Sequence, residues 1–214
     1  MPPFQVGMAI APLAVIALAR GDHPRARALV DEHDRRCNAA GTSVFESDFR
    51  ALRSAILAVD PAASESGAPE LASVIPDTQV DDYTEWSGWL APVIDMLVAR
   101  PQTEPLDSAL RTLVGDAVMK RTDPVRAQAE RLTAHLAARA GDDARARAGW
   151  ERAHRLADGC GLAFDSAVIA LELAEHGGGR VSDALSSARD TFRRLGARPW
   201  LVRADNVRAA QSPG

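Results

Sequence analysis

The sequence predicts an all-α protein built from repeated helical pairs. Two observations support this prediction: one amphipathic helix pattern recurs along the chain, and strand-like alternation of β-branched residues is nearly absent. The helical stretches are rich in Ala, Arg, Leu and Glu, which favour helix. Since 214 residues are enough for a row of about five helical pairs, we expect a single helical-repeat domain over residues 1–214.

The clearest copy of the pattern spans residues 141–161. Its small and apolar residues recur at steps of three and one, which places them on one face of a helix: Ala146, Gly149, Trp150, Ala153, Leu156, Ala157 and Cys160. The pattern returns at 21–41, with the same Arg-Ala-Arg-Ala run, and at 181–196, and each copy ends on glycine. A weaker copy covers 106–120. The spacing of the copies corresponds to a unit of about 40 residues, the size of known helical-pair repeats.

Local start and stop signals place helices along most of the chain. Asp22 and the pair Asp123-Pro124 are start signals, Ser43–Glu46 forms a capping box, and glycines end several helices. The N-terminal helix covers about 12–20, or begins near residue 4 with a kink at Pro12. The other expected helices cover about 23–40, 43–59, 81–99, 106–120, 123–140, 143–160, 162–176, 180–195 and 199–210.

The segment at about 60–80 departs from the repeat. Proline and serine take positions where the apolar face would fall, at Ser66, Pro69, Ser73 and Pro76. We expect an irregular Pro/Ser-rich segment there, with at most a short helix near Glu70.

Composition and charge exclude several classes of protein. Hydrophobic residues make up 46% and charged residues 25%, which argues against a disordered chain. The formal net charge of −4 argues against a general nucleic-acid binder, so we expect no direct nucleic-acid binding. No run approaches the roughly 20 apolar residues that span a bilayer, and the apolar run at 6–19 lacks the basic start of a signal peptide. We therefore expect a cytoplasmic protein without membrane contact.

The two cysteines form no metal or redox motif. Cys37 and Cys160 lie at the ends of two repeat helices and make neither a CxxC nor a Cys/His spacing. We expect both to be reduced and partly buried.

The main alternative hypothesis, that the protein is an enzyme, depends on three acidic residues. Asp81, Asp82 and Glu85 form a DDxxE pattern that can present carboxylates to magnesium, as in terpene synthases, beside Trp86 and Trp89. Acidic residues in the first turn of a helix also simply complement its dipole. The chain is short for a terpene synthase, lacks a second metal motif and has only 5% aromatic residues. A small all-α enzyme with a metal site here is therefore the second hypothesis.

Other candidate sites are weaker. Glu172 and His176 lie one helical turn apart, but two ligands do not make a metal site. His33 lies on an apolar face, where we expect a hydrogen-bonded, half-buried imidazole rather than a ligand. The sequence contains no GxGxxG, P-loop, GxSxG or HExxH motif. The Arg-rich helices also carry many acids, which is typical of solvated faces with salt bridges. We name no catalytic residue, cofactor or metal ligand and expect a protein that is not an enzyme.

The C-terminal run 184–210 contains the phrase F-x-x-L-G-A-x-x-W-x-x-R-A, at Phe192, Leu195, Gly196, Ala197, Trp200, Arg203 and Ala204. This phrase resembles the last helical repeat of the large LuxR-type, ATP-dependent regulators of actinobacteria. The ARGD and RARALV phrases within 19–30 are similar to the tetratricopeptide-like arm of the same regulators. The resemblance implies antiparallel, tetratricopeptide-like helical pairs that form a right-handed solenoid.

The resemblance also implies a role in signal transduction and transcriptional regulation. The 214 residues hold neither the nucleotide-binding ATPase nor the helix-turn-helix of these regulators, so only the arm's role of receiving a protein partner or a small-molecule effector carries over. On the last helix, Trp200, Leu201, Ala204 and Val207 form a candidate interaction surface. If Trp200 and Leu201 are partly exposed, they predict a partner protein or a homodimer; if all four residues face inward, the chain is a capped monomer.

Overall fold

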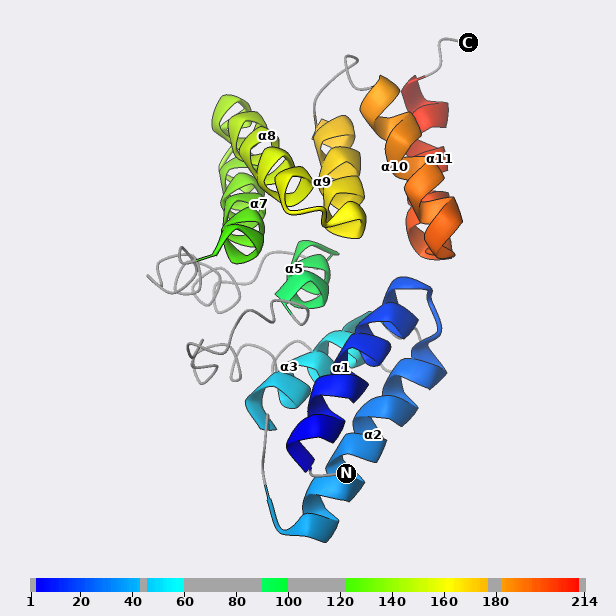
Figure 1. Ribbon diagram of the computed structural model, residues 1–214. Coiled ribbons are helices and arrows are strands. Elements are labelled where there is room, and N and C mark those ends of the chain that lie inside the picture. Colours follow the sequence, from blue (N-terminus) through cyan, green and yellow to red (C-terminus); the bar gives the residue numbers. More distant parts are fainter. Residues whose placement is uncertain (1–2, 43–45, 60–89, 100–121, 177–181, 212–214) are drawn as a thin grey trace. The chain divides into compact units, whose positions relative to one another are not determined.

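The computed structural model describes residues 3–42, 46–59, 90–99, 122–176 and 182–211, and every regular element among them is an α-helix (Figure 1). This confirms the all-α prediction for the described part of the chain. The predicted irregular segment at 60–80, the acidic residues Asp81, Asp82 and Glu85, and the helix predicted at 106–120 lie outside the described residues.

The chain divides into two compact units, Met1–Leu113 and Val114–Gly214, and we describe each by itself. The expectation of a single repeat domain stays a prediction.

The first unit contains four described helices, α1 (Pro3–Ala19), α2 (His23–Ala40), α3 (Glu46–Val59) and α5 (Leu90–Ala99). Helices α1 and α2 form an antiparallel pair, and α3 packs on both (Figure 1). Helix α1 takes the longer of its two predicted extents, with Pro12 inside it. The core of this unit joins the three helices through Ile10, Ala11, Ala14, Ala17, Ala26, Leu29, Val30, Phe49, Leu52 and Ile56.

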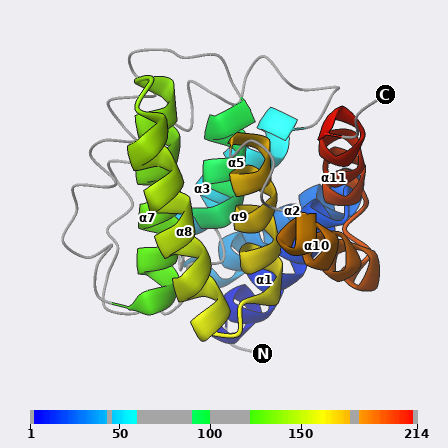
Figure 2. The same ribbon diagram turned by 90° about the horizontal axis from the view of Figure 1, so that it is seen from above.

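The second unit contains α7 (Asp123–Arg139), α8 (Asp143–Gly159), α9 (Ala163–His176), α10 (Ser182–Leu195) and α11 (Arg198–Gln211). Each helix packs against the next one along the chain, and the two views of the ribbon show successive helices side by side (Figures 1 and 2). Two apolar clusters hold this unit together. One joins α7, α8 and α9 around Trp150, and the other joins α9, α10 and α11 around Phe192.

Glycines in the left-handed conformation connect successive helices in both units. Gly21 and Gly141 have φ of 78° and 77°, a region that residues with a Cβ enter only at a cost. After each of them an aspartate caps the next helix, because the side chains of Asp22 and Asp142 accept hydrogen bonds from the backbone N–H three residues later, at 3.1 and 3.0 Å. The repeated sequence at 21–41 and 141–161 therefore forms the same local structure twice.

One glycine sets the distance between α7 and α8. A Cβ added to Gly149 would lie 2.9 Å from Cβ of Ala134, closer than side chains approach in proteins. The two helices therefore touch at a point where α8 has no side chain, as the small residues of the repeat predict.

Several boundary and burial predictions were wrong in detail. Thr122, not Asp123, is the N-cap residue of α7. The predicted apolar face of 141–161 is exposed rather than buried at its last residue, Cys160. Both cysteines are free, as expected, but only Cys37 is buried.

Candidate functional site

The predicted interaction surface on α11 packs largely against its own unit. Ala204 is fully buried, while Trp200, Leu201 and Val207 are half-buried against the α9–α11 cluster. The Trp200 ring lies 5.9 Å from the ring of Phe164 and 6.1 Å from that of Phe192. Its other contact is the Arg203 guanidinium, 5.3 Å from the ring centroid, in the geometry of a cation–π interaction. Part of the Trp200 side chain remains exposed, and its role in partner binding stays a prediction.

Polar contacts hold α11 onto its neighbours. Arg203 donates to both carboxylate oxygens of Glu175 on α9, and the Gln211 side chain donates to the backbone carbonyl of Ala174 at 3.0 Å. Arg189 on α10 donates to Asp205. Ala204 is the one fully buried residue among the described residues of α11, and these polar contacts add to the packing of Trp200, Leu201 and Val207 against the cluster.

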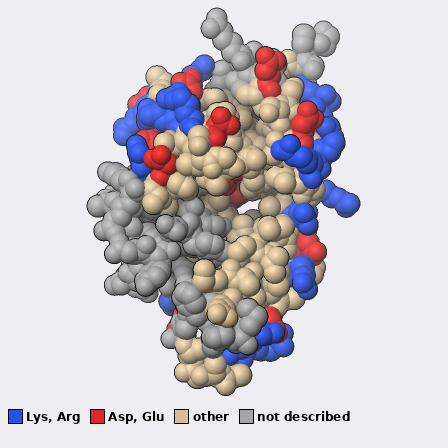
Figure 3. All heavy atoms as spheres, in the orientation of Figure 1, with Lys and Arg blue, Asp and Glu red and all other residues tan. Residues whose placement is uncertain are grey.

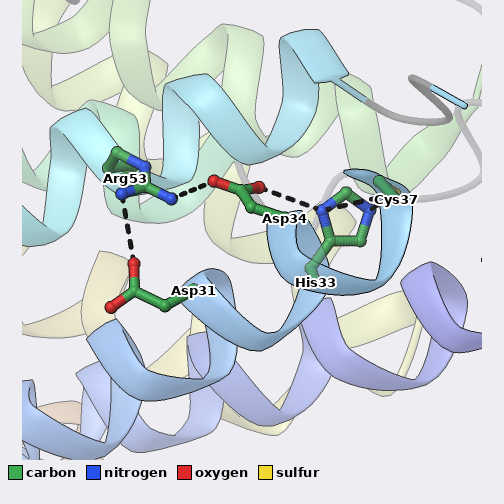
Figure 4. A network of polar contacts seen from close by, with 5 residues as sticks. All are labelled: Asp31, His33, Asp34, Cys37 and Arg53. Carbon is green, nitrogen blue, oxygen red and sulfur yellow. Dashed lines mark hydrogen bonds and ion pairs between the residues drawn. The ribbon is translucent and has the colours of Figure 1, made fainter. Parts of the chain in front are cut away.

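A second polar network joins α2 and α3 in the first unit (Figure 4). Arg53 on α3 donates to Asp31 at 3.1 Å and pairs with Asp34, both on α2. The carboxylate of Asp34 lies 3.3 Å from Nδ1 of His33, and Nε2 of His33 lies 3.3 Å from Sγ of Cys37. His33 is thus hydrogen-bonded, as predicted, but it is buried rather than half-buried.

In this network a cysteine, a histidine and an aspartate contact one another in the sequence of a Cys-His-Asp catalytic triad. The cysteine thiol is not activated as it is in such a triad. Burial and the nearby carboxylate of Asp34 raise the pKa of the Cys37 thiol, so the thiol stays protonated at neutral pH. The His33 ring also stacks on Phe49, with ring centroids 3.4 Å apart, which covers one face of the imidazole. The arrangement fits a structural contact between helices better than an activated nucleophile.

Among the residues that the structure describes, the most deeply buried charges lie between α7 and α9. Glu172 is 0% exposed and Arg131 1%, and Nε of Arg131 donates to Oε2 of Glu172 at 2.8 Å. Nε2 of His135 lies 3.1 Å from the same oxygen. Burial alone would raise the pKa of Glu172, but the Arg131 guanidinium and His135 outweigh it and hold the pKa well below its usual range. The carboxylate is therefore ionised at neutral pH.

Aromatic contacts extend this network from the interior to the surface. His135 meets the Trp150 ring edge-on, and His176 stacks on that ring with centroids 4.5 Å apart and an angle of 12° between the planes. Burial, with the nearby His135, lowers the pKa of His176. Helices α7, α8 and α9 thus each contribute to one row of polar and aromatic side chains.

The structure separates the two residues that the sequence offered as a metal pair. Glu172 points to Arg131 and His135, while His176 lies on Trp150. Among the described residues, no three His, Cys, Asp or Glu side chains are grouped so that they could hold a metal ion. The DDxxE carboxylates lie outside the described residues.

The exposed charges of both units are mixed. Figure 3 shows basic and acidic side chains among one another on the face it draws. Several form ion pairs, including Arg152 with Glu130, Arg126 with Asp123 and Arg193 with Asp190. This agrees with the solvated faces that the sequence predicts.

Comparison of the chain with protein-family models, curated proteins and solved structures gives no match. In the described part of the chain, no helix is both long and apolar enough to cross a membrane.

Proposed function

We propose that the chain is a non-enzymatic interaction or sensor domain, similar to the helical-repeat arm of LuxR-type regulators and acting in the cytoplasm. Its ligand is a protein partner or a small-molecule effector. The observation that carries the proposal is that the same connection between two helices, a left-handed glycine followed by a capping aspartate, occurs in both units.

The two connections have nearly the same backbone angles at the capping aspartate. Asp22 has φ −87° and ψ 70°, and Asp142 has φ −94° and ψ 76°. Each follows a left-handed glycine, and each begins a helix whose buried face is spaced as in the other copy. Repetition of one helical-pair unit supports a tetratricopeptide-like, right-handed solenoid, and such arrays bind their partners on extended surfaces.

Helix α11 is the proposed contact element. Trp200, Leu201 and Val207 keep part of their surface exposed beside the buried Ala204, and aromatic residues are enriched at the centre of protein interfaces. A partner or a second copy that covers these residues would bury apolar surface without disturbing the core beneath.

The test is to measure the mass of the protein by light scattering over a range of concentrations. We expect a concentration-dependent dimer that Trp200→Glu disrupts while helicity stays unchanged. The control is Val202→Glu, because Val202 lies on the same helix but is 60% exposed and has no place in the cluster. A wild-type monomer at high concentration would contradict the dimer, and unfolding of the Trp200→Glu variant would show that Trp200 belongs to the core.

A further inference from the structure

Helix α1 has an exposed apolar face. Three large hydrophobic side chains on it, Met8, Leu13 and Ile16, are each about half exposed. With the exposed Gln5 they follow the spacing of one helical stripe, on the side opposite the residues that pack on α2 and α3. Among the described residues, the one other large hydrophobic side chain that is exposed to this degree is Val202 on α11.

This face of α1 carries no charge. The whole of Pro3–Ala19 contains no Asp, Glu, Lys or Arg, whereas the neighbouring helix α2 exposes Arg25, Arg35 and Arg36. A surface helix ordinarily has a polar side, and a helix that is apolar all round is ordinarily buried. Helix α1 therefore has a second face suited to burial, and the packing of its own unit uses only the first.

The chemistry of the exposed face limits what can cover it. Nucleic acids and anionic lipid surfaces are bound through basic residues, which Pro3–Ala19 lacks. An apolar helix stripe packs on a second apolar stripe, ridges into grooves. A second copy of the chain supplies a stripe of the same length, and no like charges meet when the two stripes are related by a two-fold axis.

We propose that the exposed face of α1 pairs with the same face of a second copy, antiparallel, about a two-fold axis near Leu13. That alignment places Met8 of one copy beside Ile16 of the other and opposes the two helix dipoles. Gln5 and the exposed Arg20 lie at the two ends of the stripe, so the contact has an apolar centre and polar ends, as interfaces do. The α1–α2 pairs of the two copies then form a four-helix bundle.

The size of the face sets the strength of this contact. From Gln5 to Ile16 it spans about three turns of helix, and its three large side chains are already half covered within one copy. Such a contact lies at the small end of specific interfaces, at roughly 1,000 Å² in total. We therefore expect a weak dimer that forms as the protein concentration rises. The contact goes beyond the proposed function, because it uses no residue of α11.

Cross-linking of the whole chain through introduced cysteines tests the pairing. Leu13→Cys and Gln5→Cys are each made in a Cys160→Ser background, where the remaining Cys37 is buried, and are treated with a short bismaleimide. Leu13→Cys should give a covalent dimer about tenfold faster than Gln5→Cys, because antiparallel pairing separates the two copies of residue 5 by about 20 Å. The Cys160→Ser chain alone should give no covalent dimer.

Charge variants made in the Leu13→Cys background identify the surface. Ile16→Glu should abolish cross-linking, because the dimer would bury a carboxylate against apolar side chains, and Met8→Glu should do the same at the other end of the stripe. Ala28→Glu, at an exposed position of α2, is the matched control and should leave the rate unchanged. Since Met8 and Ile16 are exposed, circular dichroism should show unchanged helicity in both variants.

Two results would overturn the proposal directly. Equal rates for Leu13→Cys and Gln5→Cys would show random collision or a parallel pair, and a rate that Ile16→Glu and Met8→Glu leave unchanged would place the contact elsewhere. Trp200→Glu, made in the Leu13→Cys background, separates this contact from the proposed surface on α11, and we expect it to leave the rate unchanged. Loss of cross-linking in that variant would show that the copies meet through α11, which would overturn the pairing through α1 and support the function proposed for α11.

Discussion

At the residue scale, the pairing of Glu172 with Arg131 is the most consequential contact in the second unit. The two charges are almost wholly removed from water, and each is tolerated there only because the other is present. Removing one leaves the other buried without its counter-charge. Such a pair makes the contact between α7 and α9 sensitive to a single substitution.

We predict that Glu172→Gln lowers the free energy of unfolding by about 3–5 kcal/mol, because Arg131 keeps its charge and loses its partner. Urea unfolding followed by circular dichroism measures the change. Glu130→Gln is the matched control, since its pair with Arg152 is partly exposed on both sides and surface pairs contribute only about 0–1 kcal/mol. Equal losses in the two variants would contradict the argument.

The same pair has a defined pH dependence. Because the pKa of Glu172 is lowered from its ordinary value of 4.5, its contribution is complete above pH 4.5 and is lost as the pH falls below it. We therefore expect the difference in unfolding free energy between the wild type and Glu172→Gln to shrink below that pH. A difference that stays constant down to the acid-unfolding region would show that the carboxylate is not the ionised partner of Arg131.

The two cysteines should differ in reactivity. Cys160 is exposed, while Cys37 is buried beside His33 and its pKa is raised. Since the thiolate is the reactive form, we predict that a disulfide reagent such as DTNB modifies one thiol promptly in the native protein and the second only after denaturation. The variant Cys160→Ser should show no prompt phase; a prompt phase that persists would identify Cys37 as accessible.

At the scale of the helices, sequence patterns predicted well where helices lie and predicted poorly which helix faces contact each other. The start of α2 after Asp22 and the extent of α8 follow from caps and apolar faces, which are local signals. The buried pair was missed because Arg131 and Glu172 are 41 residues apart and no local rule says which helix faces meet. A signal was present at Glu172, which follows directly on the run of buried apolar residues Ala167–Leu171 in α9, and a charge in such a place indicates a buried partner.

The crossing of α7 and α8 gives a prediction about small residues. Gly149→Ala should destabilise the protein by about 1–3 kcal/mol, because the new methyl group would meet Ala134 at 2.9 Å and force the helices apart. This outweighs the gain in helix propensity of about 1 kcal/mol. Thermal or urea unfolding measures it.

Gly159 provides the control on the same helix. A Cβ there meets nothing within 4 Å, so Gly159→Ala should be neutral or stabilising, by at most about 1 kcal/mol. If both alanine variants had the same effect, the close approach at Gly149 would not determine the spacing of the two helices.

At the scale of the whole molecule, the net charge and the pairing of the arginines disfavour one class of partner, nucleic acid. The chain has a net charge of −4, and arginines such as Arg152 and Arg193 are paired with acids. Binding to DNA depends on a surplus of positive charge that displaces counterions. The Arg-rich faces of this chain offer little such surplus.

We therefore predict no sequence-specific DNA binding by this chain alone. A gel-shift titration at physiological salt, with random-sequence duplex as competitor, should show no discrete complex. Weak retardation that disappears as salt is raised would still agree with the prediction. A sharp, competitor-resistant shift would contradict it and direct attention to the exposed arginines of α8 and α10.

The short connections between successive helices also affect how quickly each unit can fold. Only two or three residues separate α1 from α2, α7 from α8, α8 from α9 and α10 from α11, so most contacts join residues that are near one another in sequence. Folding rates rise as contacts become more local, because little chain entropy is lost in closing each loop. The ion pair between Arg131 and Glu172 joins residues 41 positions apart, further along the chain than the other ion pairs and hydrogen bonds described above. We expect the helical pairs to assemble first and this buried pair to close last.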